Sequence, residues 1–155
     1  MSEPTDLPGA VPLPEPVTFD RLTAQLDAAE LNLTPAGENK LRGRWQENII
    51  EFVLNTGKTS VLQLQGLSGV QVAAEREVAV ATFANDWHRD RIWPTVLWTP
   101  TSVGTLALRT IYAADVTGGA TAEQLRDIVR LGISTTAKCL TGLEEAFTTS
   151  ADQPE

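Results

Sequence analysis

The side chains that most often carry out catalysis or bind a metal are scarce in this sequence, which contains one histidine and one cysteine. A Ser–His–Asp relay would depend on His88 alone, and a metal site built from several histidines is excluded. A single cysteine forms no internal disulfide. Because Cys139 stands in an apolar helical pattern, we expect its thiol to act as a small hydrophobic group. The residues therefore predict no catalytic centre, no metal site and no cofactor.

Two pairs of carboxylates have the chemistry needed for general acid–base catalysis, namely Asp86 with Asp90 and Glu144 with Glu145. The first pair is four residues apart on one face of an expected helix, and two arginines stand beside it. Ion pairing on a solvated helix surface accounts for this arrangement without a catalytic role. His88 should likewise face solvent at the end of that helix. We therefore expect that the protein is not an enzyme.

The segment Thr56-Gly57-Lys58-Thr59 has the same final residues as a phosphate-binding P-loop. A P-loop also has a glycine five positions before the Gly-Lys pair, where this chain has Phe52, and a helix must follow it to direct N–H groups at phosphate. Here the next residues are Val61-Leu62-Gln63-Leu64, whose alternation is typical of a strand. We interpret the segment as a turn between two strands and expect no nucleotide binding.

Residues 85–94 combine two tryptophans with two arginines in the order Asn-Asp-Trp-His-Arg-Asp-Arg-Ile-Trp-Pro. Large aromatic side chains together with arginine are enriched at protein interfaces and their hot spots. This Trp/Arg segment therefore supplies four candidate interaction residues: Trp87, Arg89, Arg91 and Trp93. The alternative is that both indoles anchor a helix-to-strand connection in the core. The sequence leaves both possibilities open.

Hydrophobic periodicity predicts three helices that would position these residues. The first should begin at Thr18, whose hydroxyl can cap it, and should stop before Pro35, with Gly37 opening a turn. The second should cover about 75–89. A capping box, Thr121-x-x-Gln124, should open a long third helix with an apolar stripe that ends at Phe147.

About five strands should lie between the helices, at 41–46, 49–54, 60–67, 96–98 and 106–113, joined by polar turns. The element order is therefore α-β-β-β-α-β-β-α. Consecutive strands joined by tight turns pair in antiparallel fashion, and the helices are expected to pack on one face of the sheet. The sequence predicts an α+β fold.

The net charge of −8 over 155 residues is concentrated at the two ends. Residues 1–17 are rich in proline and hold three acids without a base, and residues 148–155 hold two acids without a base. We expect a disordered acidic arm over 1–17, one domain over 18–147 and a disordered tail over 148–155. With no clustered Lys and Arg, the sequence predicts no nucleic-acid partner. No stretch resembles a membrane helix or a signal peptide, so we expect a cytoplasmic protein that does not bind membranes.

Three stretches of the sequence form a recognisable set: Asn85-x-Trp87-x-Arg89-x-Arg91-x-Trp93-Pro94, the passage Ala114-Asp115-Val116 with Gly119-x-Thr121-x-x-Gln124-Leu125, and the terminal Leu143-Glu144-Glu145-Ala146-Phe147. Together they resemble the YbjN family in the form found in actinobacteria. The likeness covers about residues 18–147. It implies a fold similar to that of type III secretion chaperones, which are small acidic dimers that hold partner polypeptides, and a role as a sensory transduction or stress regulator.

The resemblance brings no catalytic residues with it, and the fold alone does not define a function. We expect a protein-interaction module that binds a polypeptide partner or a second copy of itself as a homodimer. The alternative is a small-molecule sensor with its ligand between the sheet and the helices.

Overall fold

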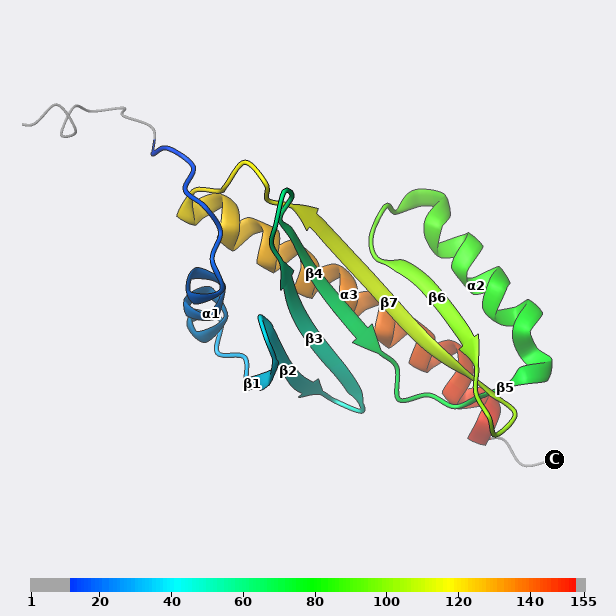
Figure 1. Ribbon diagram of the computed structural model, residues 1–155. Coiled ribbons are helices and arrows are strands. Elements are labelled where there is room, and N and C mark those ends of the chain that lie inside the picture. Colours follow the sequence, from blue (N-terminus) through cyan, green and yellow to red (C-terminus); the bar gives the residue numbers. More distant parts are fainter. Residues whose placement is uncertain (1–11, 153–155) are drawn as a thin grey trace, which may run out of the picture.

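The protein folds into an antiparallel sheet with three α-helices, and the computed structural model describes residues 12–152 (Figure 1). The strands lie in the order β1-β2-β3-β4-β7. Strand β7 pairs with β4 along one side and with β6 along the other, and the short β5 pairs with β7 on the same side as β4. Along the chain the elements are α1 (Phe19–Ala28), β1 (Leu33–Gly37), β2 (Lys40–Trp45), β3 (Asn48–Asn55), β4 (Val61–Leu67), β5 (Val72–Ala73), the 3-10 helix η2 (Ala74–Arg76), α2 (Glu77–Asp90), β6 (Thr95–Pro100), β7 (Thr105–Asp115) and α3 (Ala122–Asp152).

The core lies between the sheet and the helices, because alternate residues of each strand point to one face. On β3 the residues Ile50, Phe52 and Leu54 are buried, and their neighbours point to the opposite face. The long helix α3 crosses this buried face behind β4 and β7 (Figure 1), and α1 packs against α3. Helix α2 lies beside β6, and Phe83 of α2 lies against α3 at Gly142. All three helices therefore cover the same face, which confirms the expected α+β class.

The observed sheet has seven strands, two more than the sequence predicted. One of the two, β1, contains both Pro35 and Gly37, which led us to expect a turn there. Proline is tolerated in β1 because this strand lies at the edge of the sheet and pairs only with β2. The other, β5, has two residues, too few for any alternation to be visible. Helix α1 also ends at Ala28, well before Pro35.

The expected helix caps are confirmed. The Thr18 hydroxyl accepts a hydrogen bond from the Arg21 N–H at 3.1 Å, at the start of α1. At the start of α3, the Gln124 N–H donates to the Thr121 hydroxyl at 3.1 Å, and the Thr121 N–H donates back to Gln124 Oε1 at 2.9 Å. This reciprocal pair is the capping box read from the sequence, and it fixes where the chain turns from β7 into α3.

The end of the proline-rich segment is part of the fold, which corrects the boundary expected at residue 17. Glu15 forms an antiparallel bridge with Ala120, with N–H···O distances of 3.2 and 2.9 Å. The Arg21 guanidinium donates to the carbonyl oxygens of Glu15, Pro16 and Ala120. Val17 is 5% exposed and belongs to the core. Proline prevents a longer strand here, but a single bridge and one buried side chain suffice to dock the segment.

The two ends of the chain were expected to form a disordered arm and a disordered tail. Helix α3 continues through Asp152, beyond the end expected at residue 147. The other residues of the predicted arm and tail, 1–11 and 153–155, lie outside the described residues, so their disorder stays a prediction.

Val17→Ala should lower the free energy of unfolding by about 1–3 kcal/mol, because it removes two buried methyl groups from the docked segment. Leu13→Ala is the matched control, since Leu13 is 80% exposed and should change stability by no more than about 0.5 kcal/mol. Urea denaturation of both variants measures the difference. Equal stability of the two variants would show that the docked segment contributes nothing.

Candidate functional site

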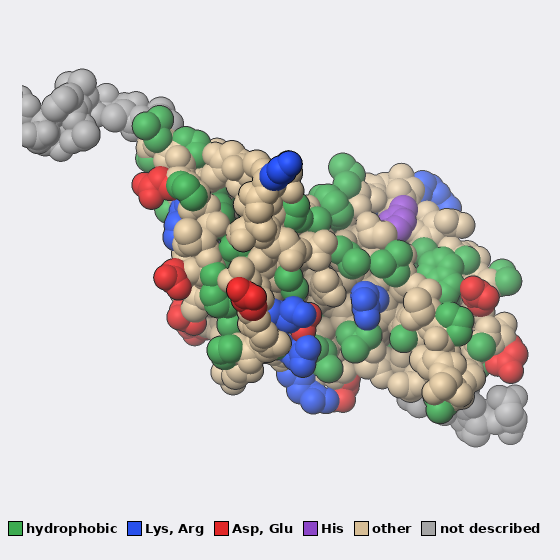
Figure 2. All heavy atoms as spheres, in the orientation of Figure 1, with side chains coloured by type: hydrophobic (Ala, Val, Ile, Leu, Met, Phe, Trp, Pro, Cys, Tyr) green, Lys and Arg blue, Asp and Glu red, His purple; other side chains and the backbone are tan. Residues whose placement is uncertain are grey.

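The face of the sheet opposite the helices is not covered by any described element, and its side chains form regular rows across the strands. One row runs Arg44, Ile49, Leu67, Arg109 and Leu97, from β2 to β6. The next contains Arg42, Glu51, Gln65, Ile111 and Thr95, and a third contains Lys40, Val53, Gln63 and Ala113. We call these three rows the open face. Figure 2 looks onto it and shows Lys and Arg side chains gathered over β2 and β3, with apolar side chains between them and over β6.

The charges on the open face are mostly positive, although the whole chain carries −8. The three rows hold four cations (Lys40, Arg42, Arg44 and Arg109) against one carboxylate, Glu51, which gives a local charge of +3. Glu51 is paired twice: Arg42 Nη2 lies 2.7 Å and Lys40 Nζ 3.9 Å from its carboxylate oxygens. Arg44 and Arg109 are exposed and form no ion pair within residues 12–148. Two positive charges on this face are therefore free to attract an acidic group.

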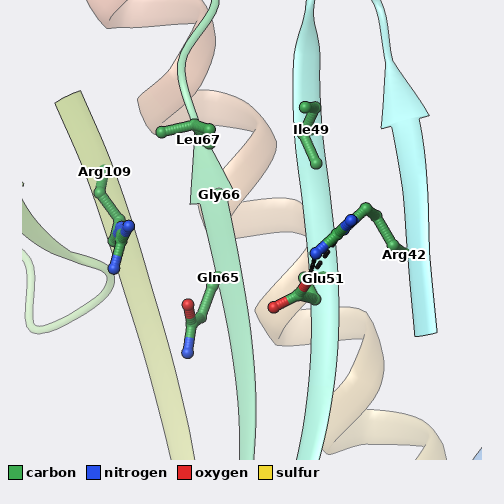
Figure 3. A pocket seen from close by; sticks show the side chains of 7 residues that line it. All are labelled: Arg42, Ile49, Glu51, Gln65, Gly66, Leu67 and Arg109. Atoms are coloured by element: carbon green, nitrogen blue, oxygen red, sulfur yellow. Dashed lines mark hydrogen bonds and ion pairs between the residues drawn. The ribbon is translucent and has the colours of Figure 1, made fainter. Parts of the chain in front are cut away.

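A hollow of about 330 Å³ lies at the centre of the open face (Figure 3). Arg42 of β2 and Glu51 of β3 point toward each other on one side of it, and Arg109 of β7 stands on the other side. Ile49 and Leu67 form its apolar part and are 36% and 37% exposed. Protein-binding surfaces often combine exposed aliphatic side chains with arginines. The hollow has this composition, together with the side-chain amide of Gln65.

Our reading of the sequence missed this cation cluster. The signal was the spacing Lys40-x-Arg42-x-Arg44, which puts three cations on one face of any strand. The fourth member, Arg109, lies far away in the chain and reaches the cluster only because β7 pairs with β4. The expectation that no Lys and Arg cluster exists is therefore corrected for this face.

Both tryptophans of the Trp/Arg segment are used in packing. Trp87 is 9% exposed, and its indole N–H donates to the Trp93 carbonyl oxygen at 3.3 Å. Trp93 is half-buried, and its ring meets that of Tyr112 edge-on at 5.5 Å. Both indoles therefore pack at the connection between α2 and β6, as the alternative to an interface role described. Partner binding by this segment stays a prediction.

The two arginines of the segment lie at the surface. Arg89 forms an ion pair with Asp86 at 2.6 Å, as expected for a solvated helix face. The Arg91 guanidinium lies over the Trp87 ring, 4.1 Å from its centroid. Ile92, between Arg91 and Trp93, is 80% exposed. The exposed surface of this segment therefore includes Arg89, Arg91 and Ile92, and the Trp87 indole lies beneath Arg91.

The remaining candidate groups have structural positions. His88 is exposed as expected, but its Nε2 also accepts a hydrogen bond from the Val96 N–H at 3.3 Å, which ties the end of α2 to β6. Cys139 is fully buried, and burial raises the pKa of its thiol to about 12, so it stays protonated and unreactive at neutral pH. The Thr56–Thr59 segment lies in the turn between β3 and β4, as expected.

The described residues hold neither a metal-binding cluster nor a helix that could span a membrane. No group of three or more His, Cys, Asp or Glu side chains in this part of the chain is arranged to hold a metal ion. None of the described helices has the length and apolar character required to cross a membrane.

The fold and the open face together define a small α+β protein with helices on one side of the sheet and a basic, partly apolar surface on the other. The chain belongs to the YbjN family: residues 18–145 match this family, which is described as a putative bacterial sensory transduction regulator. This confirms the resemblance noted from the sequence. No curated protein matches the sequence significantly.

Among solved structures, the chain is similar to the crystal structure of YbjN, a putative transcription regulator from E. coli. The TM-score is 0.65 at 13% sequence identity, and the match covers 80% of this chain and 89% of that one. At this identity the likeness shows a shared fold. The expected likeness to secretion chaperones, the actinobacterial form and the homodimer stay predictions.

Proposed function

We propose that this chain is a non-enzymatic regulatory module that acts in the cytoplasm by binding an acidic polypeptide segment on its open face. The observation that supports this most strongly is a mainly basic, partly apolar sheet surface on an otherwise acidic protein. Complementary charge steers a partner to a surface and selects against wrong partners. The exposed Ile49, Leu67 and Leu97 supply the apolar contacts that make such binding stable.

A polypeptide fits the open face better than a nucleic acid does. Binding to a phosphate backbone depends on many unneutralised cations. On this face Glu51 already pairs with Arg42 and Lys40, which leaves two exposed arginines. A short acidic segment with aliphatic side chains can instead pair with Arg44 and Arg109 and cover the leucines beside them.

The Trp/Arg segment is retained as a second proposed contact surface, through Arg89, Arg91 and Ile92. This segment lies on α2 and in the connection to β6, away from the open face. The segment and the open face can therefore each bind a partner at the same time. A second copy of the chain is the partner predicted for this surface from the sequence.

The proposal is tested by replacing Gln65, at the centre of the open face, with the photoreactive residue p-benzoylphenylalanine in cells of the host. We expect a discrete cross-linked adduct that contains a polypeptide with an acidic segment. The same residue placed at Lys138, which is exposed on α3, should not give this adduct.

A matched pair of charge reversals provides the control for this experiment. Arg109→Glu, on the open face, should abolish the adduct, whereas Arg130→Glu, at an exposed position of α3, should leave it intact. An adduct with nucleic acid, or a polypeptide adduct that survives Arg109→Glu, would contradict the proposal.

A further inference from the structure

The first row of the open face places charge and hydrocarbon in a regular order: Arg44, Ile49, Leu67, Arg109 and Leu97. Two aliphatic side chains lie between the two arginines, and all five side chains are exposed (Figure 3 shows the three central ones). The row contains no carboxylate, and neither arginine forms an ion pair within residues 12–148. A linear ligand can therefore meet charge, hydrocarbon and charge in succession along this row.

The sheet sets the spacing along this row. Neighbouring strands lie about 4.8 Å apart, and Arg44 of β2 is separated from Arg109 of β7 by three successive strand pairings. The two positions are therefore about 14 Å apart, with Ile49 about 5 Å and Leu67 about 10 Å along the line between them. A ligand that pairs with both arginines must present two acidic groups about 14 Å apart with hydrocarbon between them.

An extended polypeptide that crosses the strands has this spacing. Its residues advance about 3.4 Å each, and alternate side chains point to the same face. The side chains of residues i, i+2 and i+4 therefore face the sheet at about 0, 7 and 14 Å. Acids at i and i+4 meet Arg44 and Arg109, and an aliphatic residue at i+2 lies between Ile49 and Leu67, which line the hollow of the open face.

A helix fits this row less well. Side chains on one face of a helix recur at i+4, i+7 and i+11, at about 6, 10 and 16 Å, so the second acid passes beyond Arg109. A helix is also about 10 Å wide and would extend over the next row, only about 7 Å away. In that row Arg42 is already paired with Glu51, so a wider acidic ligand finds no free cation there.

We propose that the open face recognises an extended segment of a partner protein with the pattern acid-x-aliphatic-x-acid, which lies across the strands and pairs its acids with Arg44 and Arg109. This inference rests on the proposed function and specifies the sequence of the acidic segment. Neither acidic end of the chain itself has this pattern, because no two acids in residues 1–17 or 148–155 are four positions apart.

The experiment is an NMR titration of the full chain with two synthetic peptides of identical composition and blocked ends. Ser-Asp-Ser-Leu-Ser-Asp-Ser has its acids four apart. Ser-Asp-Ser-Leu-Asp-Ser-Ser has them three apart, so that in an extended chain one acid points away from the sheet. We expect both to shift the amide signals of Ile49, Leu67 and Arg109, with the first peptide bound about 2- to 5-fold more tightly, the value of one exposed ion pair.

Three variants show whether the two arginines cause this preference. Arg44→Gln and Arg109→Gln should each abolish it, because each leaves a single arginine that either peptide can satisfy with one acid. Arg130→Gln, at an exposed position of α3, should keep the preference of the wild type.

The inference is overturned if neither peptide shifts these signals or if the preference survives Arg109→Gln. Equal binding of both peptides by the wild type overturns it too, and is the result expected of a helical ligand, in which acids three or four apart share one face. The proposed function is decided separately by the cross-link from Gln65 and its loss in Arg109→Glu, since that adduct requires an acidic partner but no particular spacing of its acids.

Discussion

Replacing Leu143 by alanine should lower the free energy of unfolding by about 2–5 kcal/mol, the range found when a fully buried leucine is truncated and leaves a cavity. Leu143 is 0% exposed on the side of α3 that packs on the rest of the core. Helix α3 covers both β4 and β7, so a cavity beneath it weakens the contact on which the whole layer depends.

The control is the same substitution at another position of the same helix. Leu131 is 50% exposed, so Leu131→Ala should change stability by no more than about 0.5 kcal/mol. Urea denaturation followed by circular dichroism measures both variants. If they lose the same amount, α3 is not packed on the sheet as described.

The second large effect is expected at Gly132, where α3 passes over Tyr112 of β7. A Cβ at this position would lie 2.7 Å from two carbon atoms of the Tyr112 ring. Gly132→Val therefore pushes the ring aside, together with its hydrogen bond from the hydroxyl to the Ile128 carbonyl oxygen at 2.9 Å and its contact with Trp93. We expect a loss of about 2–4 kcal/mol from overpacking and the lost hydrogen bond.

Gly118→Val is the control for this prediction, because a Cβ at Gly118 has nothing within 4 Å. It should shift the unfolding midpoint little. The near-ultraviolet circular dichroism of the Gly132 variant should also change, since the surroundings of Tyr112 and Trp93 are disturbed. Equal midpoints for the two valine variants would be incompatible with the close approach of α3 and β7.

Features that depend on neighbours along the chain were predictable from the sequence. The capping box at Thr121 and Gln124 involves residues three apart, and the apolar stripe of α3 follows from the helical period, so both could be read directly. The turn at Thr56–Thr59 was predictable for the same reason, since strand alternation resumes immediately after it. In contrast, β1 was missed because Pro35 is compatible with a strand only at a sheet edge, and edge position is a property of the whole sheet.

The candidate site was less predictable, because it depends on the pairing of strands that are distant in sequence. Arg44 and Arg109 share a row only through the registers of three successive strand pairs. A shift by one residue in any pair would place the side chains on opposite faces. The tryptophans posed another difficulty: an indole with a polar N–H suits a core and an interface equally well. The hydrogen bond from Trp87 to the Trp93 carbonyl is visible only in three dimensions.

Both outer strands of the sheet contain a proline, Pro35 in β1 and Pro100 in β6. Each proline removes one N–H from a row of backbone groups that could otherwise template the addition of another strand. Both outer strands are therefore poorer templates for edge-to-edge pairing and for growth into a continuous sheet between molecules.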